Sequence, residues 1–186
     1  MKFDIHTLIG KATAYDKKQQ IEAKRPKSWL KSVSAFANGE GGTLIFGISD
    51  DDQVVGLENA ELDSELISEA IKTKLDPIPS IKLEFQEFDG RKLILLYVAP
   101  GDETPYYYIG DKQRVAFVRI GNESVVADRI QLRNLVLKGT GKNFDSLAAP
   151  YRFEDMSFSV LKTDIEMPFT AKMQSKVPQK HKVNYR

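Results

Sequence analysis

Three stretches of the chain carry apolar residues at the spacing of an amphipathic helix. After Pro26, which suits the first turn of a helix, apolar side chains recur every three or four residues up to Ala37, and Asn38-Gly39 favours a stop. The same spacing runs from 59 to 75, where Asp76-Pro77 ends it, and again from 128 to 138. The pattern predicts three helices.

Alternating or continuous apolar runs of strand length lie between these helices. They predict three hairpins, which pair 43–48 with 54–57, 81–88 with 92–98, and 106–109 with 115–120. The order is then one helix, a hairpin, a helix, two hairpins and a closing helix. We therefore expect an α+β domain over about residues 10–138, with a mixed, largely antiparallel sheet and flanking helices.

Composition limits the rest of the chain and its chemistry. The 186 residues are 41% hydrophobic, enough for one domain and an appendage. The absence of cysteine excludes disulfides, thiolate zinc sites and cysteine nucleophiles. No apolar run reaches the roughly 20 residues of a membrane span, so we expect a soluble cytoplasmic protein without membrane partners. Residues 139–186 read as a linker and tail, or as the start of a truncated downstream region.

The net charge of +1 hides a strong segregation of charge along the chain. Between 17 and 31 there is one acid, Glu22, against six cations: Lys17, Lys18, Lys24, Arg25, Lys27 and Lys31. The stretch from 49 to 76 is strongly acidic. A basic segment of this kind favours contacts with phosphate groups, and the alternative is an ordinary solvated surface.

Several strings in the basic and glycine-containing part of the sequence resemble one known family. They are Ile21-Glu22-Ala23-Lys24-Arg25, then Ala35-Phe36-Ala37-Asn38-Gly39-Glu40-Gly41-Gly42, then Val55-Gly56-Leu57, Thr104-Pro105-Tyr106 and Phe117-Val118-Arg119-Ile120-Gly121. Together they resemble the Schlafen AlbA-2 domain, also catalogued as a divergent AAA-4 domain, over about residues 15–138.

This resemblance implies nucleic-acid binding, with DNA favoured over RNA. Prokaryotic members are usually described as transcriptional regulators, often with an ATPase-like or winged-helix part downstream. Some animal relatives cleave tRNA and rRNA with a cluster of carboxylates. We therefore expect a DNA-binding domain of a regulator that needs no cofactor, and a metal-dependent nuclease is the first alternative.

The expected nucleic-acid contacts come from cations, a glycine turn and an amide. They are Lys24, Arg25, Lys27, Asn38, Gly41, Gly42 and Arg119. Backbone N–H groups at the glycine pair can hold a phosphate oxygen, although a tight turn needs glycines as well. A guanidinium suits bidentate phosphate contact, but Arg119 can equally pair with Glu123 or with an acid of the 50–52 turn. Asn38 can also simply cap its helix.

A nuclease would use Glu22, Lys24 and Asp50 as catalytic residues, with Glu22 and Asp50 holding a divalent cation. Glu22 and Lys24 face the same side if their segment is extended. The nuclease-active relatives carry another acid where Lys17 stands here. Structural roles for these residues, in ion pairs and turns, are the alternative. The near-neutral net charge leaves a third interpretation open, a protein-interaction or homo-oligomerisation domain.

Overall fold

The computed structural model describes residues 14–141, and the predicted linker and tail from residue 142 onward lie outside them. The described helices are α2 (Lys27–Asn38), α3 (Ala60–Lys74) and α4 (Arg129–Gly139). The described strands are β1 (Tyr15–Lys18), β2 (Gly42–Phe46), β3 (Leu75–Asp76), β4 (Ile81–Phe88), β5 (Arg91–Val98), β6 (Tyr107–Gly110), β7 (Gln113–Ile120) and β8 (Glu123–Val126). The three predicted helices and the two later hairpins are confirmed.

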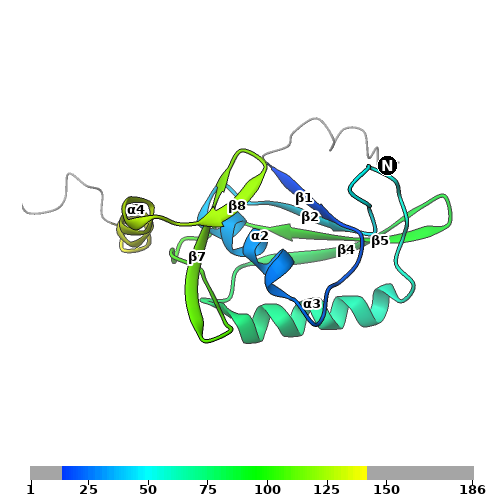
Figure 1. The fold of residues 1–186 in the computed structure, drawn as a ribbon, viewed down its shortest axis with the longest axis horizontal. Helices are drawn as coiled ribbons and strands as arrows, with labels where there is room; N and C mark the ends of the chain where they lie inside the picture. The colour runs from blue at the N-terminus through cyan, green and yellow to red at the C-terminus, as the bar shows by residue number, and fades with distance from the viewer. Residues whose placement is uncertain (1–13, 142–186) are drawn as a thin grey trace, which may run out of the picture. The chain divides into compact units, whose positions relative to one another are not determined.

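The strands form two four-stranded sheets, in the orders β1-β2-β5-β4 and β3-β6-β7-β8. Only the β1–β2 pair is parallel among the described strand pairs, so the α+β class with mixed, largely antiparallel pairing is confirmed. The division into two sheets was not expected. Figure 1 shows α2 at the centre of the described elements, with α3 running along the strands β4 and β5.

The main core forms around α2, which packs against both sheets. Its Trp29 and Phe36 are buried, and alternate residues of β2 and β5 point toward it. The ring of Trp29 meets the ring of Phe46 edge-on at 5.7 Å between centroids. From the other sheet, Tyr106, Tyr108 and Phe117 join the same cluster. Because nine residues of α2 are buried, this helix is the central element of the fold.

The segment after β2 forms only the start of the predicted hairpin. A single bridge between Ile48 and Val54 replaces a ladder with 54–57. The N–H groups of Val55 and Gly56 both bond to the Gly47 carbonyl at 2.9 Å, and Gly47 and Gly56 have φ angles of 103° and 76°. The chain therefore turns across β2 and covers the second, smaller apolar cluster of the first sheet.

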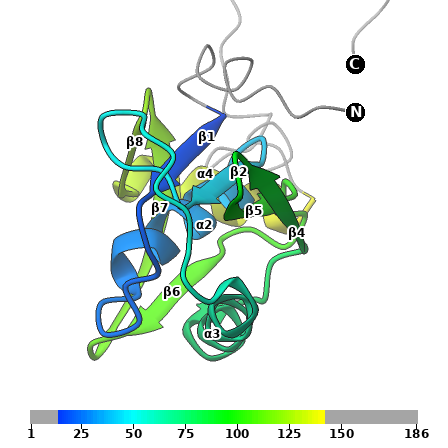
Figure 2. The ribbon, with the colours of Figure 1, turned by 90° about the vertical axis from the view of Figure 1, so that its right-hand side faces the viewer.

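Two strands carry no signal that the sequence analysis recognised. β1 contains Asp16, Lys17 and Lys18, so it shows no apolar alternation, and its parallel register with β2 holds it in place. β8 has only four residues and completes a hairpin with β7 across the turn at Gly121. Figure 2 shows β1 beside β2 and α3 apart from both. Among the described helices, none is both long and apolar enough to cross a membrane.

Candidate nucleic-acid interface

The start of α2 and the loop before it place several cations on one surface. The loop turns tightly, since the Arg25 N–H donates to the Glu22 carbonyl at 2.9 Å and the Ser28 N–H donates to the Arg25 carbonyl at 2.9 Å. Trp29 and Leu30 are buried, so their side of the helix faces the core. Lys27 and Lys31, four residues apart, lie together on the partly exposed side.

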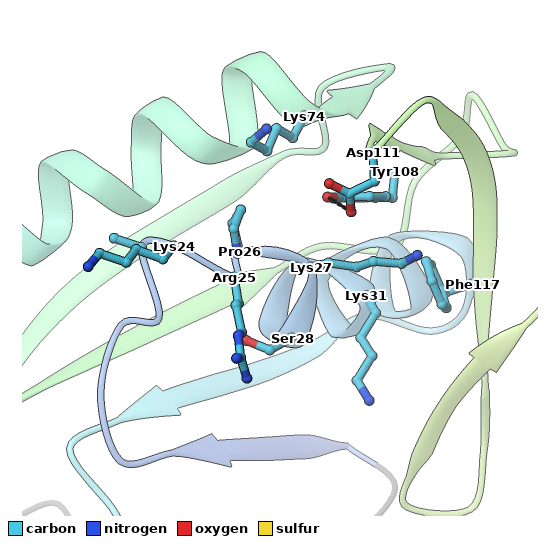
Figure 3. A pocket seen from close by; sticks show the side chains of 11 residues that line it. Lys24, Arg25, Pro26, Lys27, Ser28, Lys31, Lys74, Tyr108, Asp111 and Phe117 are labelled. Carbon is cyan, nitrogen blue, oxygen red and sulfur yellow. Dashed lines mark hydrogen bonds between the residues drawn. The ribbon is translucent and has the colours of Figure 1, made fainter.

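These cations line an open hollow of about 600 Å³. Its lining residues are Ala23, Lys24, Arg25, Pro26, Lys27, Ser28, Lys31, Lys74, Tyr108, Asp111 and Phe117. Figure 3 shows these side chains around the first turn of α2, with Lys74 coming from the last turn of α3. Five cations and one acid, Asp111, thus line the hollow, which carries more positive than negative groups although the chain is nearly neutral.

Most of these cations have no acidic partner. Lys24, Arg25, Lys31 and Lys74 form no salt bridge within residues 14–141. Lys27 donates to Gln113 Oε1 at 2.9 Å, and its Nζ lies 5.5 Å from the centroid of the Tyr108 ring. The positive charge of the hollow is therefore available to an anionic ligand.

The two cations at the start of the basic segment are neutralised. Lys17 Nζ lies 2.6 Å from Asp52 Oδ1 and also donates to the Asp50 carbonyl at 2.7 Å. Lys18 Nζ lies 3.7 Å from Asp16 Oδ2. The structure thus divides the predicted basic segment into a paired part on β1 and an unpaired part at the hollow.

The single acid in the hollow is itself engaged. Asp111 Oδ2 accepts a hydrogen bond from the Tyr108 hydroxyl at 3.1 Å. Burial raises the pKa of the Tyr108 hydroxyl, and the bond to Asp111 adds to that rise. Tyr108 and Phe117 are almost fully buried and contribute apolar surface to the hollow.

Asn38 has a structural role instead of the predicted nucleic-acid contact. Its side chain is 4% exposed. The amide nitrogen donates to the carbonyls of Tyr106 and Phe117 at 3.0 and 2.9 Å, and the amide oxygen accepts from the Tyr106 N–H at 2.7 Å. Asn38 therefore joins α2 to the second sheet and is inaccessible to a ligand.

The glycine pair serves close packing. Gly41 has a φ angle of 82°, and its N–H donates to the Phe36 carbonyl at 3.0 Å. A Cβ atom on Gly42 would lie 2.4 Å from the Phe36 ring. These observations agree with the tight-turn interpretation. Neither glycine lines the basic hollow; both line another hollow beside β4 and β5.

Arg119 is bound within the fold, with partners that the sequence analysis did not consider. Its Nη1 donates to Ser124 Oγ at 3.1 Å, and its Nη2 donates to the Tyr15 carbonyl at 3.2 Å. The guanidinium also lies 5.1 Å from the centroid of the buried Phe36 ring. Burial lowers the pKa of Arg119. These contacts hold β1 and α2 to the second sheet. They favour a structural role for Arg119 over the predicted phosphate contact.

The proposed nuclease residues are not arranged as expected. Residues 23 and 24 form a turn, so the segment of Glu22 and Lys24 is not extended, although both residues line one small hollow. Glu22 lines a small hollow formed by residues 20–25, and Asp50 is exposed in the separate 49–53 turn. Within residues 14–141, no three histidine or acidic side chains cluster as a metal site would require.

The hollow contains residues that the sequence analysis did not assign to a site. Lys31 was recognisable, because it follows Lys27 by one helical turn. Lys74 was hidden by the acidic composition of the stretch from 49 to 76. Tyr108, Asp111 and Phe117 join the hollow only through the packing of β6 and β7 against α2. No pattern along the chain predicts that these three residues lie beside the start of α2.

Comparison with known proteins gives the same fold and a family. The Schlafen, AlbA_2 family model matches residues 11–128. The DIP2311 protein from Corynebacterium diphtheriae superposes with a TM-score of 0.52 at 20% identity, over 88% of this chain and 34% of its own length. The chain thus spans about a third of that protein. No curated protein shows significant similarity to the sequence.

A second solved structure is the N-terminal domain of a Nitrosomonas europaea protein described as related to the ATP-dependent DNA helicase RecG. It matches with a TM-score of 0.43 at 23% identity, over 61% of this chain and 80% of its own. The family model covers well over half of the sequence and spans the helices α2 and α3, both sheets and the loop that carries Lys24 and Arg25. The chain therefore belongs to the Schlafen AlbA_2 family.

Proposed function

We propose that this domain binds nucleic acid by holding phosphate groups at the basic hollow. The observation that carries the proposal is that Lys24, Arg25, Lys27, Lys31 and Lys74 line one hollow that contains a single acid. Cations that lack acidic partners repel one another, and a polyanionic ligand relieves that repulsion while releasing its own counterions. Membership of the Schlafen AlbA_2 family supports the same ligand class.

We further propose that the ligand is DNA and that the protein is a cytoplasmic transcriptional regulator. This finer assignment rests on the family resemblance alone, because phosphate contacts give affinity without choosing a sequence or a sugar. Binding to DNA and RNA of the same sequence, measured side by side, tests it. Tighter binding to RNA would contradict the choice of DNA and leave nucleic-acid binding intact.

The nuclease alternative gains no support from the geometry. Lys17, which stands where active relatives carry an acid, is bonded to Asp52 and places a positive charge where a metal ligand would be needed. We therefore predict no cleavage of DNA or RNA in the presence of Mg²⁺ or Mn²⁺. Efficient Mn²⁺-dependent cleavage that is lost in both Glu22→Gln and Asp50→Asn would contradict this prediction.

The binding proposal is tested by removing three cations of the hollow. In the variant Lys24→Ala/Arg25→Ala/Lys27→Ala we expect the affinity for unrelated sequences to fall at least tenfold in fluorescence anisotropy titrations. The matched control is Lys72→Ala/Lys82→Ala/Lys92→Ala, which removes the same charge from exposed lysines that are paired with Glu69, Glu84 and Glu61.

Both variants are first compared with the unaltered protein by thermal melting, so that loss of folding is recognised. Equal affinity of the hollow variant and the unaltered protein would refute the proposed interface. An equal loss in the control variant would show that binding follows net charge and not this surface.

A further inference from the structure

We infer that the basic hollow receives an unpaired nucleotide, so that single-stranded nucleic acid, and not duplex, is the ligand of this domain. The inference deepens the proposed function and rests on it. Three features of the described residues carry it: the shape and lining of the hollow, the burial of α2, and the acids in the hollow and along α3.

The hollow has the volume of a small-ligand site. Its volume of about 600 Å³ lies within the roughly 300–1,000 Å³ of pockets that hold small organic molecules. Accessible apolar surface comes from Ala23 and Pro26, and the largely buried Tyr108 and Phe117 lie in the wall behind it. A nucleotide combines the same two properties, a flat apolar base and an attached phosphate. In a duplex the base faces are stacked inside, and only the phosphates and groove edges are presented.

The helix at the hollow, α2, is unable to contact base edges in the groove of a duplex. A helix that enters the major groove exposes side chains along its length to the base edges. In α2 every residue from Ser32 to Asn38 is buried, as are Trp29 and Leu30. Only the first turn and Lys31 are accessible, and they form part of a concave surface. A concave site accepts a protruding group, which a single strand offers and a regular duplex does not.

Acidic groups limit the area around the cations on which a nucleic acid can lie. Lys74 is the last residue of α3, and the exposed Glu65 lies further along the same helix, where Glu61 and Glu69 are paired with Lys92 and Lys72. Asp111 lies within the hollow itself. A second strand laid across this surface would bring more phosphates toward these acids, whereas one flexible strand can follow the cations alone.

The wall of the hollow also holds a polar group without a partner. The Ser28 hydroxyl oxygen is buried and has no hydrogen-bond partner within the described residues. In Figure 3 it points toward Arg25. A hydroxyl and a guanidinium in the lining of one hollow can both donate hydrogen bonds to the oxygens of a phosphate. We assign the nucleotide's phosphate to this side of the hollow and its base to the apolar side.

The first test compares a labelled 12-nucleotide single strand with the 12-base-pair duplex of the same sequence, as DNA and as RNA, by fluorescence anisotropy with the full chain. We expect the single strand to bind at least tenfold more tightly. Equal or tighter binding of the duplex would overturn the inference and leave the proposed function standing. Failure of every probe to bind would overturn both.

The second test fills the hollow without removing a cation. Ala23 is exposed and lines the hollow, so Ala23→Trp places an indole in the space assigned to the base while retaining every cation. We expect at least a fivefold loss of affinity for the single strand. The control is Asn122→Trp, at the exposed turn between β7 and β8, which should bind as the unaltered protein does. Unchanged single-strand affinity in Ala23→Trp would place the base outside the hollow and overturn the inference.

Discussion

Asn38 belongs to the family motif, but its role is to stabilise the fold and not to bind a ligand. Its amide satisfies three backbone groups of the second sheet, two of them on Tyr106 and one on Phe117. Burial without these bonds would cost about 1–3 kcal/mol for each unsatisfied group. The Ala-Phe-Ala-Asn string thus specifies how α2 docks on β6 and β7, and the binding surface lies at the opposite end of the helix.

The substitution Asn38→Ala should therefore destabilise the fold strongly. We expect the free energy of unfolding to fall by about 3 kcal/mol in urea denaturation, since buried backbone groups would lose their partners. Asn134→Ala, at an exposed position of α4, is the matched control and should change stability by less than about 0.5 kcal/mol. A loss below about 1 kcal/mol in Asn38→Ala would argue against this structural role.

Asp111 offers a test in which affinity should rise instead of fall, because it is the one acid in the hollow. Its φ angle of 50° lies in the left-handed region, where asparagine is well tolerated. Asp111→Asn removes a negative charge and keeps the shape, so nucleic-acid affinity should rise by about two- to fivefold, in line with about 1 kcal/mol for one screened charge. Weaker binding in anisotropy titrations would contradict the electrostatic account of the hollow.

At the scale of elements, the sequence predicts those whose pattern is local. α2, α3 and α4 have helical spacing and recognisable ends, and the β4–β5 hairpin has strict alternation around Asp89-Gly90. β1 is polar and is held by its pairing with β2, so no local signal exists. The 54–57 segment has strand composition, but its bonds to Gly47 override that preference.

Two lysines in the last turn of α3 provide a contrast within one element. Lys74 lines the hollow, whereas Lys72 lies 3.8 Å from Glu69 and lines no part of it. Lys74→Ala should weaken binding by about fivefold, equivalent to about 1 kcal/mol for one phosphate contact near a surface. Lys72→Ala should leave it within twofold. Equal effects of the two substitutions, measured by anisotropy at one salt concentration, would exclude a specific role for the last turn of α3.

At the scale of the molecule, net charge is a poor guide to what this domain binds. A total of +1 argues against a specialised duplex-binding protein, yet five cations meet at one hollow. The sequence shows four of them, Lys24, Arg25, Lys27 and Lys31, as one basic run. Pairing on β1 removes Lys17 and Lys18 from that run, and the approach of α3 adds Lys74. Both effects depend on tertiary contacts that no local pattern encodes.

The salt dependence of binding shows whether the cations of the hollow contact phosphate groups. Removing one cation that binds a phosphate lowers the slope of log affinity against log salt by about 0.7 for a single strand and about 0.9 for a duplex. For Lys24→Ala/Arg25→Ala/Lys27→Ala on the single strand we therefore predict a slope smaller by about two than that of the unaltered protein. The control Lys72→Ala/Lys82→Ala/Lys92→Ala should keep the original slope. An unchanged slope in the hollow variant would contradict the assignment of these cations to phosphate binding.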